Sequence, residues 1–525
     1  MKHLMIGAAS LALLVGCNGA EPSTQQAGVT LGEIIIGEGD PAEAGDALAA
    51  MSLADSGSGV LSFADSTVDG ASATFTDLSI AGEDAVSAGS LVFEGLDMVD
   101  GQASFSKMSL NDITVVAPDG EDGEVTLGNI ELINPSPELA AWLAASLQGA
   151  TAPFPSADKV VFDSWSMSDL SGNFAEDGSE GTFGIDSIEI RDMGDLTAKM
   201  ATISGISVDA FDASDDIDID FSLGSVTATN IDARFVEAVQ ENTDDPETML
   251  GAIMSLASEN PMDPGYDSFT MTDLTAAAAG ATFSMPSLET LVSRNDAGQP
   301  VKYTTKPYIM TLDADADGGE AGAALLQGLS MVGYESLTLK GESVGNYDPD
   351  MDIVSFDADS NYMELVDGAK FSFGGKIEGY SAYSKEAMTS FNMADLAAGA
   401  EPDPMAMTEA FGLLTVHGLE LSIDDDSLVN RVLNAVATQS GQDPAELKSQ
   451  VSMGMAMAPM MAQGTGVDMG LVTELTTALS GFITEPGELT IKLDPSEPLS
   501  FASIMENPDP AAYTKDVLGF TATHK

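Results

Sequence analysis

Basic residues are scarce in this sequence of 525 residues. Only 18 Lys and Arg stand against 84 Asp and Glu, which gives a formal net charge of −66 at pH 7. A chain with so few cations cannot displace the counterions of a phosphate backbone, so nucleic-acid partners are excluded. A charge of this size favours disorder, but 44% of the residues are hydrophobic and only 19% are charged. The chain can therefore bury a core, and its length allows more than one module.

Residues for nucleophilic catalysis are also few. The sequence has three His and one Cys, and after removal of an N-terminal signal only His417 and His524 would remain of the histidines. We expect His524, beside the C-terminus, to be disordered, and His417, inside a strand pattern, to be structural or solvated. The sequence contains no G-x-S-x-G, H-E-x-x-H or phosphate-binding glycine loop,. A carboxylate pair of the glycosidase kind stays open, because the sequence singles out none of its acids.

The first residues form an export signal. Lys2 supplies the positive start, and the apolar run Leu4–Val15 is too short to span a bilayer,. The run ends in Leu14-Val15-Gly16-Cys17, which resembles the lipobox of bacterial lipoproteins. The resemblance implies removal of residues 1–16 and a diacylglycerol on Cys17, so that acyl chains alone anchor the protein to the membrane. By resemblance to the enterobacterial sorting rule for lipoproteins, Asn18 after the cysteine favours the outer membrane. The alternative is an ordinary secretory signal that happens to contain a cysteine.

After a polar tether, residues 17–28, one pattern recurs: apolar, x, apolar, x, x, apolar, x, apolar. Clear copies are Leu91-Phe93-Leu96-Met98, Val125-Leu127-Ile130-Leu132, Phe183-Ile185-Ile188-Ile190 and Leu414-Val416-Leu419-Leu421. A flat strand would turn the second apolar pair to the opposite face. The gap residues are often Gly, Asn or Asp, which tolerate the backbone angles of a bulge. The pattern therefore predicts a curved sheet of bulged strands, and the alternative is a series of short strands joined by tight turns.

Longer self-similarity indicates duplication. Residues 162–170 recur as residues 266–274, and a stretch of helical spacing precedes each copy, at residues 139–147 and 235–258,. A third such stretch, residues 321–331, precedes a shorter echo. We therefore expect an α+β fold, mainly β: a repeated, curved antiparallel sheet covered by amphipathic helices. The expected modules are residues 29–160, residues 161–262 and a pair within residues 263–412.

The last part, residues 413–525, is predicted to be rich in helices. Three acids at residues 424–426 precede an apolar stripe of helical period, and Gly441 fits the end of that helix,. Asp443-Pro444 begins a second helix,. We expect a third helix at residues 471–482, a strand at residues 488–493, and a final turn with a short helix.

Parts of this region resemble proteobacterial envelope proteins. The segments are Thr415–Leu421, Asp426–Val429, Gly441–Pro444 and Leu489–Pro498 followed by Leu518–Phe520. They are similar to the C-terminal parts of the YdgA-like group and, more loosely, of the AsmA-like group. The resemblance implies long curved sheets, some with an apolar groove that carries lipid. Those proteins are usually held by a membrane helix, whereas this sequence has a lipobox.

Acidic and methionine clusters are the remaining candidates for a metal site. Asp313, Asp315 and Asp317, followed by glycine, copy the first half of an EF-hand calcium loop, but the twelfth position lacks the required Glu,. The three aspartates are candidate calcium ligands, but the solvated face of a strand is the preferred interpretation. The methionines in residues 453–461 are soft ligands of the kind that suits Cu(I), yet no His or Cys lies near,. Adaptable apolar packing explains them better.

These features predict a non-enzymatic, lipid-anchored protein of the bacterial envelope, an elongated scaffold or binding module. Its expected partners are the membrane, through the lipid anchor, and a lipid or an envelope protein. We expect no cofactor other than the calcium considered above. The first alternative is a lipid-binding or lipid-transfer protein with an apolar groove. A hydrolase that uses carboxylates is the second alternative.

Overall fold

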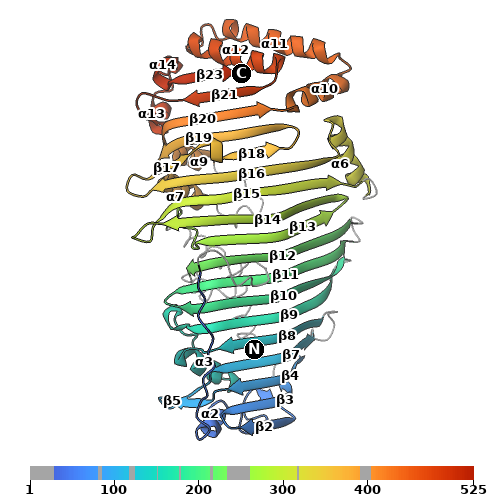
Figure 1. Ribbon diagram of the computed structural model, residues 1–525, viewed down its shortest axis with the longest axis vertical. Coiled ribbons are helices and arrows are strands. Elements are labelled where there is room, and N and C mark those ends of the chain that lie inside the picture. Colours follow the sequence, from blue (N-terminus) through green and yellow to red (C-terminus); the bar gives the residue numbers. More distant parts are fainter. Residues whose placement is uncertain are drawn as a thin grey trace. The chain divides into compact units, whose positions relative to one another are not determined.

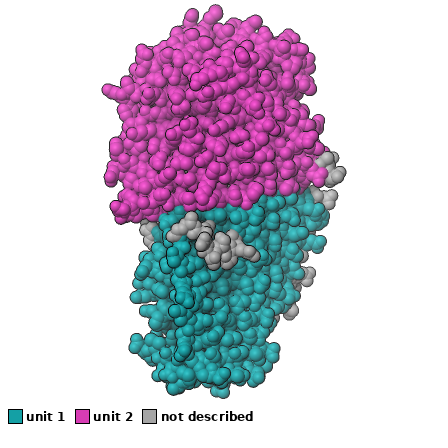
Figure 2. All heavy atoms as spheres, viewed as in Figure 1, with its two compact units in different colours: residues 1–253, 265–278 teal, residues 254–264, 279–525 magenta. Residues whose placement is uncertain are grey.

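The computed structural model describes residues 29–80, 85–116, 124–150, 152–176, 179–212, 217–232, 260–315, 319–390 and 404–525. The chain forms two compact units (Figure 2). Unit 1 comprises residues 1–253 and 265–278, and unit 2 comprises residues 254–264 and 279–525. Both consist of antiparallel sheet with added helices, so the fold is α+β and mainly β, as predicted. Within the described ranges, no helix has the length and apolar character needed to cross a bilayer.

Unit 1 contains a meandering antiparallel sheet (Figure 1). Its strands are β1 (Leu61–Ser62), β2 (Asp65–Asp69), β3 (Ser72–Ile80), β4 (Ala85–Glu94), β5 (Asp97–Val99), β6 (Gln102–Ser104), β7 (Lys107–Val116), β8 (Glu124–Ile133), β9 (Phe162–Glu176), β10 (Ser179–Gly194), β11 (Thr197–Asp212), β12 (Ile217–Asp232) and β13 (Ser268–Ala278). Neighbours pair in the order β2, β3, β4, β7, β8 and onward to β13. β1 also pairs with β3, and β5 and β6 form a separate hairpin.

One face of this sheet is apolar and packs against two helices, α2 (Ala44–Ala50) and α3 (Pro137–Leu147). α3 begins where the Ser136 hydroxyl accepts a hydrogen bond from the Leu139 N–H, and Pro137 occupies its first position,. Leu139 and Leu143 are buried, as their helical spacing predicted. The sheet contributes fully buried side chains that include Phe75 and Phe93. The helix expected at residues 235–258 lies outside the described residues.

The opposite face of unit 1, which we call the polar face, is lined with Ser, Thr and Asn. This arrangement follows from the alternation of side chains along a strand. Cross-strand hydrogen bonds join Asn111 to Ser90 (2.9 Å), Asn129 to Asn111 (2.7 Å), Thr126 to Ser171 (2.8 Å), Thr202 to Thr227 (3.2 Å) and Thr229 to Ser268 (2.6 Å). These pairs satisfy the small polar groups within the sheet itself.

Every second strand of unit 1 makes a kink at the same level. The kinked residues have a left-handed backbone, with φ between 51° and 66°, and are Asp77, Asp112, Asp169, Gly205 and Asp273. The register aligns them in one row across the sheet, the central row. Facing them on the strands between are Gly89, Gly128, Asp186 and Gly224. Asp and Gly suit this row because they tolerate the left-handed conformation. The facing glycines leave room for the Asp side chains: a Cβ on Gly128 would lie 2.7 Å from Asp169 Oδ2.

The central row explains the gap in the apolar pattern, in a different way from the bulge that we predicted. A bulge places two residues opposite one. In unit 1 the pairing instead keeps the same register across the gap, as from Thr76 and Ser90 to Leu78 and Ala88. At this row each strand has two residues, instead of one, between successive apolar positions. Because every strand has the extra residue at the same level, neighbouring strands stay in register and the apolar residues return to the same face.

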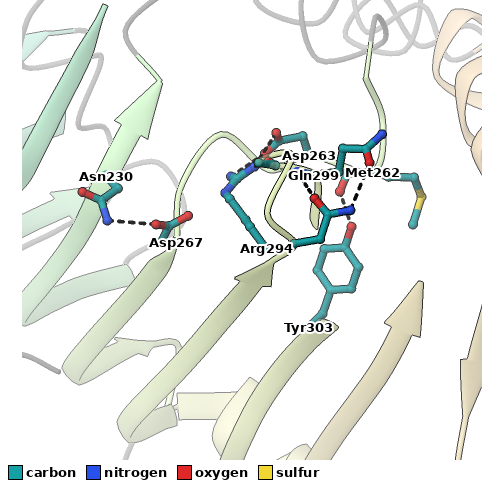
Figure 3. A network of polar contacts seen from close by, with 9 residues as sticks. Asn230, Met262, Asp263, Asp267, Arg294, Gln299 and Tyr303 are labelled. Carbon is teal, nitrogen blue, oxygen red and sulfur yellow. Dashed lines mark hydrogen bonds and ion pairs between the residues drawn. The ribbon is translucent and has the colours of Figure 1, made fainter. Parts of the chain in front are cut away.

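The strands between those five have their own left-handed residues, in a second row near the strand ends, the edge row. These residues are Gly95, Asn134, Asp192 and Asn230, with φ between 50° and 67°. The side chains of the last three bond to the residues that face them: Asn134 donates to Asp163 at 2.6 Å, Asp192 accepts from Lys199 at 3.1 Å, and Asn230 donates to Asp267 at 2.8 Å (Figure 3). Each long strand from β3 to β13 therefore has one left-handed residue in one of the two rows.

Unit 2 is also antiparallel. Its strands are β14 (Ala281–Arg294), β15 (Pro300–Ala314), β16 (Ser336–Asp348), β17 (Ile353–Phe356), β18 (Tyr362–Leu365), β19 (Ala369–Glu378), β20 (Thr415–Asp425), β21 (Glu488–Leu493), β22 (Leu499–Ser500) and β23 (Phe520–His524). The register shifts in three of its strand pairs, and the shift between β19 and β20 confirms the bulge predicted at the 417–418 gap. Between β19 and β20, Lys376 pairs with Gly418 and Ile377 with Val416, which leaves His417 as the extra residue.

Helices surround the strands of unit 2. They are α6 (Gly319–Met331), α7 (Tyr380–Ser390), α9 (Pro404–Phe411), α10 (Leu428–Ser440), α11 (Pro444–Met461), α12 (Met469–Thr484), α13 (Phe501–Glu506) and α14 (Lys515–Leu518). The predicted caps are confirmed: Gly441 ends α10 with φ of 67°, and Asp443 accepts the Ala445 N–H at 2.8 Å. α12 packs on β21 and β23 through Phe482, Leu489 and Phe520.

The C-terminal residues differ from the prediction. The short helix predicted within residues 495–525 is present as α14, but the chain continues into strand β23, which pairs with β21 and contains the His524 that we predicted to be disordered. His524 Nε2 hydrogen-bonds to the Glu485 carbonyl at 2.8 Å. The alternation in Phe520-Thr521-Ala522 turns two apolar residues to α12, and this burial orders the terminus,.

Candidate functional site

The N-terminal segment, residues 29–40, crosses the polar face of unit 1 along the edge row (Figure 1). We call it the strap. The Gly32 N–H donates to Asp192 Oδ2 at 2.8 Å, and the Asn134 amide donates to the Ile35 carbonyl at 2.9 Å. The Asp40 N–H donates to the Leu96 carbonyl at 3.0 Å. The strap therefore passes from β10 over β8 to the end of β4, held by backbone and side-chain hydrogen bonds.

Glycines allow the strap to lie this close to the sheet. A Cβ on Gly37 would lie 2.6 Å from Ser106 Oγ, and one on Gly39 would lie 2.5 Å from the carbonyl carbon of Gly95. Burial alone would raise the pKa of Asp192, but the hydrogen bond from Gly32 and the charge of Lys199 outweigh it and hold this pKa below its usual range,. The Asp192 carboxylate is therefore the charged fixing point of the strap.

Unit 2 has a hollow of about 610 Å³ on the face of its sheet that carries Lys376. Its floor is bare backbone, because Gly374, Gly375 and Gly418 meet there. One wall is the turn at Asp357 and Ala358, which leaves the sheet between β17 and β18. The other residues that line it, by side chain or main chain, are Asn346, Ser355, Phe356, Lys376, His417, Leu419, Glu420, Lys492, Leu493 and Asp494.

The bulge in β20 turns His417 toward this hollow. Its Nε2 lies 2.8 Å from Glu378 Oε2 on β19, and its side chain is 22% exposed. The carboxylate holds the imidazole in place. His417 and Glu378 lie on the neighbouring strands β20 and β19, next to the shift in register.

The charges in the hollow are partly paired and partly open. Lys492 forms an ion pair with Glu420 at 2.8 Å. Lys376, in contrast, has no ion-pair partner among the described residues, and neither does Asp494. Lys376 pairs with Gly418 across the strands, and continuing the register places Asp494 beyond Gly418. A lysine and a carboxylate thus stand two strands apart, about 10 Å between their Cα atoms, with only a glycine between them.

A second polar cluster fixes the start of unit 2 (Figure 3). Arg294 makes two hydrogen bonds to the Asp263 carboxylate, at 2.7 and 2.8 Å, and the Tyr303 hydroxyl donates to the Met262 carbonyl. Burial, reinforced by the negative charge of Asp263, raises the pKa of Tyr303. The hydroxyl therefore stays protonated and serves as a donor. This cluster joins residues 260–264 to the β14–β15 hairpin, and its role is structural.

The residues that the sequence singled out are not gathered in one place. Cys17 and Asp317 lie outside the described residues. Asp313 is part of β15, where it pairs with Ser336, and Asp315 directly follows that strand, so both belong to a strand end. Within the described ranges, no group of three or more His, Cys, Asp or Glu is arranged to hold a metal.

The methionines expected in the C-terminal part lie on α11. Met453, Met457, Met460 and Met461 are between 51% and 77% exposed, at positions that share one side of the helix,. They form an adaptable surface on unit 2 with no His or Cys among them.

Sequence reasoning did not find the hollow. The sequence places His417 inside a strand pattern, and Lys376, Glu420, Lys492 and Asp494 are ordinary strand or turn residues. The usable signal was the glycine pair Gly374-Gly375 on the strand that pairs with the strand of Gly418, since these three glycines leave a stretch of sheet without side chains.

Comparisons with known proteins give no activity. A family model described as "Uncharacterized protein" matches residues 362–525, which is less than a third of the chain and includes the Lys376, His417 and Asp494 side of the hollow. No curated protein matches the sequence.

Proposed function

We propose that this protein is a non-enzymatic, lipid-anchored binding module of the bacterial envelope. In this proposal, acyl chains on Cys17 hold it to the outer membrane, and unit 2 binds a ligand in the hollow. The observation that carries the proposal is the strap, because it joins the expected anchor to the folded body.

The strap supports a tether in a specific way. Eleven residues separate Cys17 from Val29, where the described chain begins, so the contour length between them is at most about 40 Å,. A pull on Cys17 would reach Asp192 and Asn134 first, since these side chains hold residues 32 and 35. The load would then spread over several strands of unit 1 instead of one sheet edge.

The hollow supports the binding half of the proposal. Its volume of about 610 Å³ lies within the range of small-molecule sites, which is roughly 300 to 1,000 Å³. Its polar groups come from five separate strands, and Lys376 and Asp494 stand in it without ion-pair partners among the described residues. Open charges in a depression are groups that a ligand can satisfy.

Replacement of Cys17 by Ser tests the anchor. We expect the variant to appear in the soluble fraction and to incorporate no labelled fatty acid, while the wild type sediments with outer membranes. Ser23→Ala, in the same tether, is the matched control and should behave as the wild type. Membrane retention of the Cys17→Ser variant would refute the anchor.

A lipid-binding function is the second candidate, and one observation favours it. On the opposite face of the unit 2 sheet, Phe373 and Leu421 pair across β19 and β20 and are 42% and 43% exposed. Met363 on β18 is 46% exposed. The corresponding apolar face of unit 1 is packed under α2 and α3. Native mass spectrometry of the purified protein would support this candidate by showing co-purified phospholipid, and a Phe373→Ser, Leu421→Ser variant should then lose it.

A further inference from the structure

We infer that the hollow of unit 2 binds a zwitterion of dipeptide size, with the ligand carboxylate at Lys376 and the ligand ammonium at Asp494. This inference rests on the proposed binding function and specifies its ligand. It does not depend on the lipid anchor.

One row of cross-strand partners runs across the hollow and determines where its charges lie. Starting at β16, the partners are Asn346, Ser355, Lys376 and Gly418, and the register of the last strand pair places Asp494 next. Several other lysines on the sheets stand beside an acid on the next strand and pair with it, as Lys492 does with Glu420 and Lys340 with Glu364. Gly418 replaces the residue that would pair with Lys376, so Lys376 and Asp494 face each other across an open strand.

The separation of these two charges selects the size of the ligand. Their Cα atoms are about 10 Å apart, or two strand spacings. An extended dipeptide spans about 7 Å, so its ends can reach an ammonium and a carboxylate that lean into the hollow from both sides. The two charged ends of a single amino acid lie too close together to meet both groups at once.

The rest of the lining suits a peptide backbone. Gly374 and Gly375 expose main chain at the floor, and the Asn346 amide and Ser355 hydroxyl stand on the same row as Lys376. These groups can exchange hydrogen bonds with an amide. The other charged side chains of the lining already have partners: Glu420 is held by Lys492, and the Asp357 carboxylate accepts the Asp359 N–H within its own turn. Lys376 and Asp494 are therefore the charged groups that a ligand of the hollow would meet, one with its carboxylate and the other with its ammonium.

Calorimetric titration of the full-length lipoprotein in detergent tests the inference with four probes. These are glycylglycine, glycylglycine amide, which lacks the carboxylate, N-acetylglycylglycine, which lacks the ammonium, and glycine. We expect glycylglycine to bind at least about tenfold more tightly than each of the others, because each loses one charged hydrogen bond.

Two variants assign the contacts. Lys376→Gln should weaken glycylglycine binding about tenfold and abolish the preference over the amide, while Asp494→Asn should abolish the preference over the N-acetyl peptide. Lys302→Gln is the matched control: Lys302 is opposite Asn346 on the same row but does not line the hollow. It should bind glycylglycine as the wild type does.

Two results would overturn the inference. One is the absence of any glycylglycine binding by the wild type at millimolar concentration, and the other is a Lys376→Gln variant that still prefers glycylglycine to its amide. Equal melting points of the variants and the wild type exclude unfolding as the cause. Membrane retention through Cys17 is measured independently, so failure here is distinguishable from failure of the anchor.

Discussion

Asp425 is a buried carboxylate that the fold only half satisfies. It is 8% exposed at the start of α10, where Oδ1 accepts the Val429 N–H at 2.8 Å. Oδ2 has no hydrogen-bond partner among the described residues. Burial raises the pKa of Asp425, and the neighbouring charges of Asp426 and Asp424 add to this, against the opposing backbone hydrogen bonds. The charged form is therefore the destabilising one.

Asp425→Asn should consequently stabilise the protein at neutral pH. Asn keeps the Oδ1 acceptor for Val429 and removes the buried charge, and we expect a gain of about 1 kcal/mol in the free energy of unfolding. A carboxyl whose pKa is raised in the folded state loses its penalty once it is protonated. The gain should therefore shrink as the pH is lowered from 7 toward the raised pKa. Denaturant titrations at several pH values measure it, and a variant less stable than the wild type at pH 7 would contradict the assignment.

Residues whose contacts are local could be predicted from the sequence. The caps at Gly441 and Asp443 depend on neighbours within a few positions, so sequence spacing was sufficient. The relation of Lys376 to Asp494 depends on two strand registers between segments far apart in the sequence. No spacing in the sequence encodes such a register, and the hollow could not be predicted.

At the scale of elements, the strap is an extended segment fixed on the polar face by a charged group. Asp192→Asn keeps a residue that tolerates a left-handed backbone but removes the charge that attracts Gly32 and Lys199,. We expect hydrogen exchange in residues 30–36 to rise about three- to tenfold, which corresponds to the loss of about 1 kcal/mol. Asp186→Asn, on the same strand but in the central row, is the control and should leave the strap unchanged.

The effect should disappear in acid. A carboxylate whose pKa is lowered in the folded state stabilises the protein above its unfolded pKa of about 3.9 and loses this contribution as the pH falls through the folded value,. The difference between wild type and variant should therefore shrink below about pH 4 and disappear below the lowered pKa of Asp192. Equal exchange of the strap at pH 7 in both proteins would show that Asp192 does not hold it.

The elements themselves were largely predictable, but their kinks were not. The helices α3, α6, α10, α11 and α12 lie where apolar spacing and caps placed them. The same two-residue gap, however, is a step shared by all strands in unit 1 and a bulge in unit 2, as at His417. The shared step and the bulge give the same apolar pattern within one strand. They differ only in whether the partner strand also has the extra residue, which one strand's sequence does not show.

At the scale of the whole molecule, the net charge of −66 must be accommodated on the surface. Some of the negative charges lie close together. Asp169 and Asp186 face each other on adjacent strands in the central row, which is an unfavourable arrangement of like charges,. Lysines and arginines on the sheets are mostly joined to acids of the same or neighbouring strands, such as Lys107 to Glu131 at 2.6 Å. Most of the acids have no such compensation, because cations are too few.

Stability should therefore rise with ionic strength. The screening length falls from about 30 Å at 0.01 M salt to about 10 Å at 0.1 M, which weakens repulsion between exposed carboxylates. We expect the melting temperature to increase between these concentrations of NaCl, with a similar increase in KCl. An equally concentrated neutral solute should have little effect. A melting temperature that falls with salt would show that attractive pairs outweigh the repulsion.

The two rows of left-handed residues restrict how such a sheet can lengthen. Since the central row and the edge row alternate from strand to strand, the smallest repeating piece is a hairpin of two strands. Insertion of a single strand would bring two kinks of the same row side by side and would reverse the chain direction for everything that follows. The repeated sequence of β9 returns in β13, four strands later, with Asp169 and Asp273 in the same row. If the sheet grows by whole hairpins, strands are always added two at a time. Related chains should therefore differ from one another by an even number of strands.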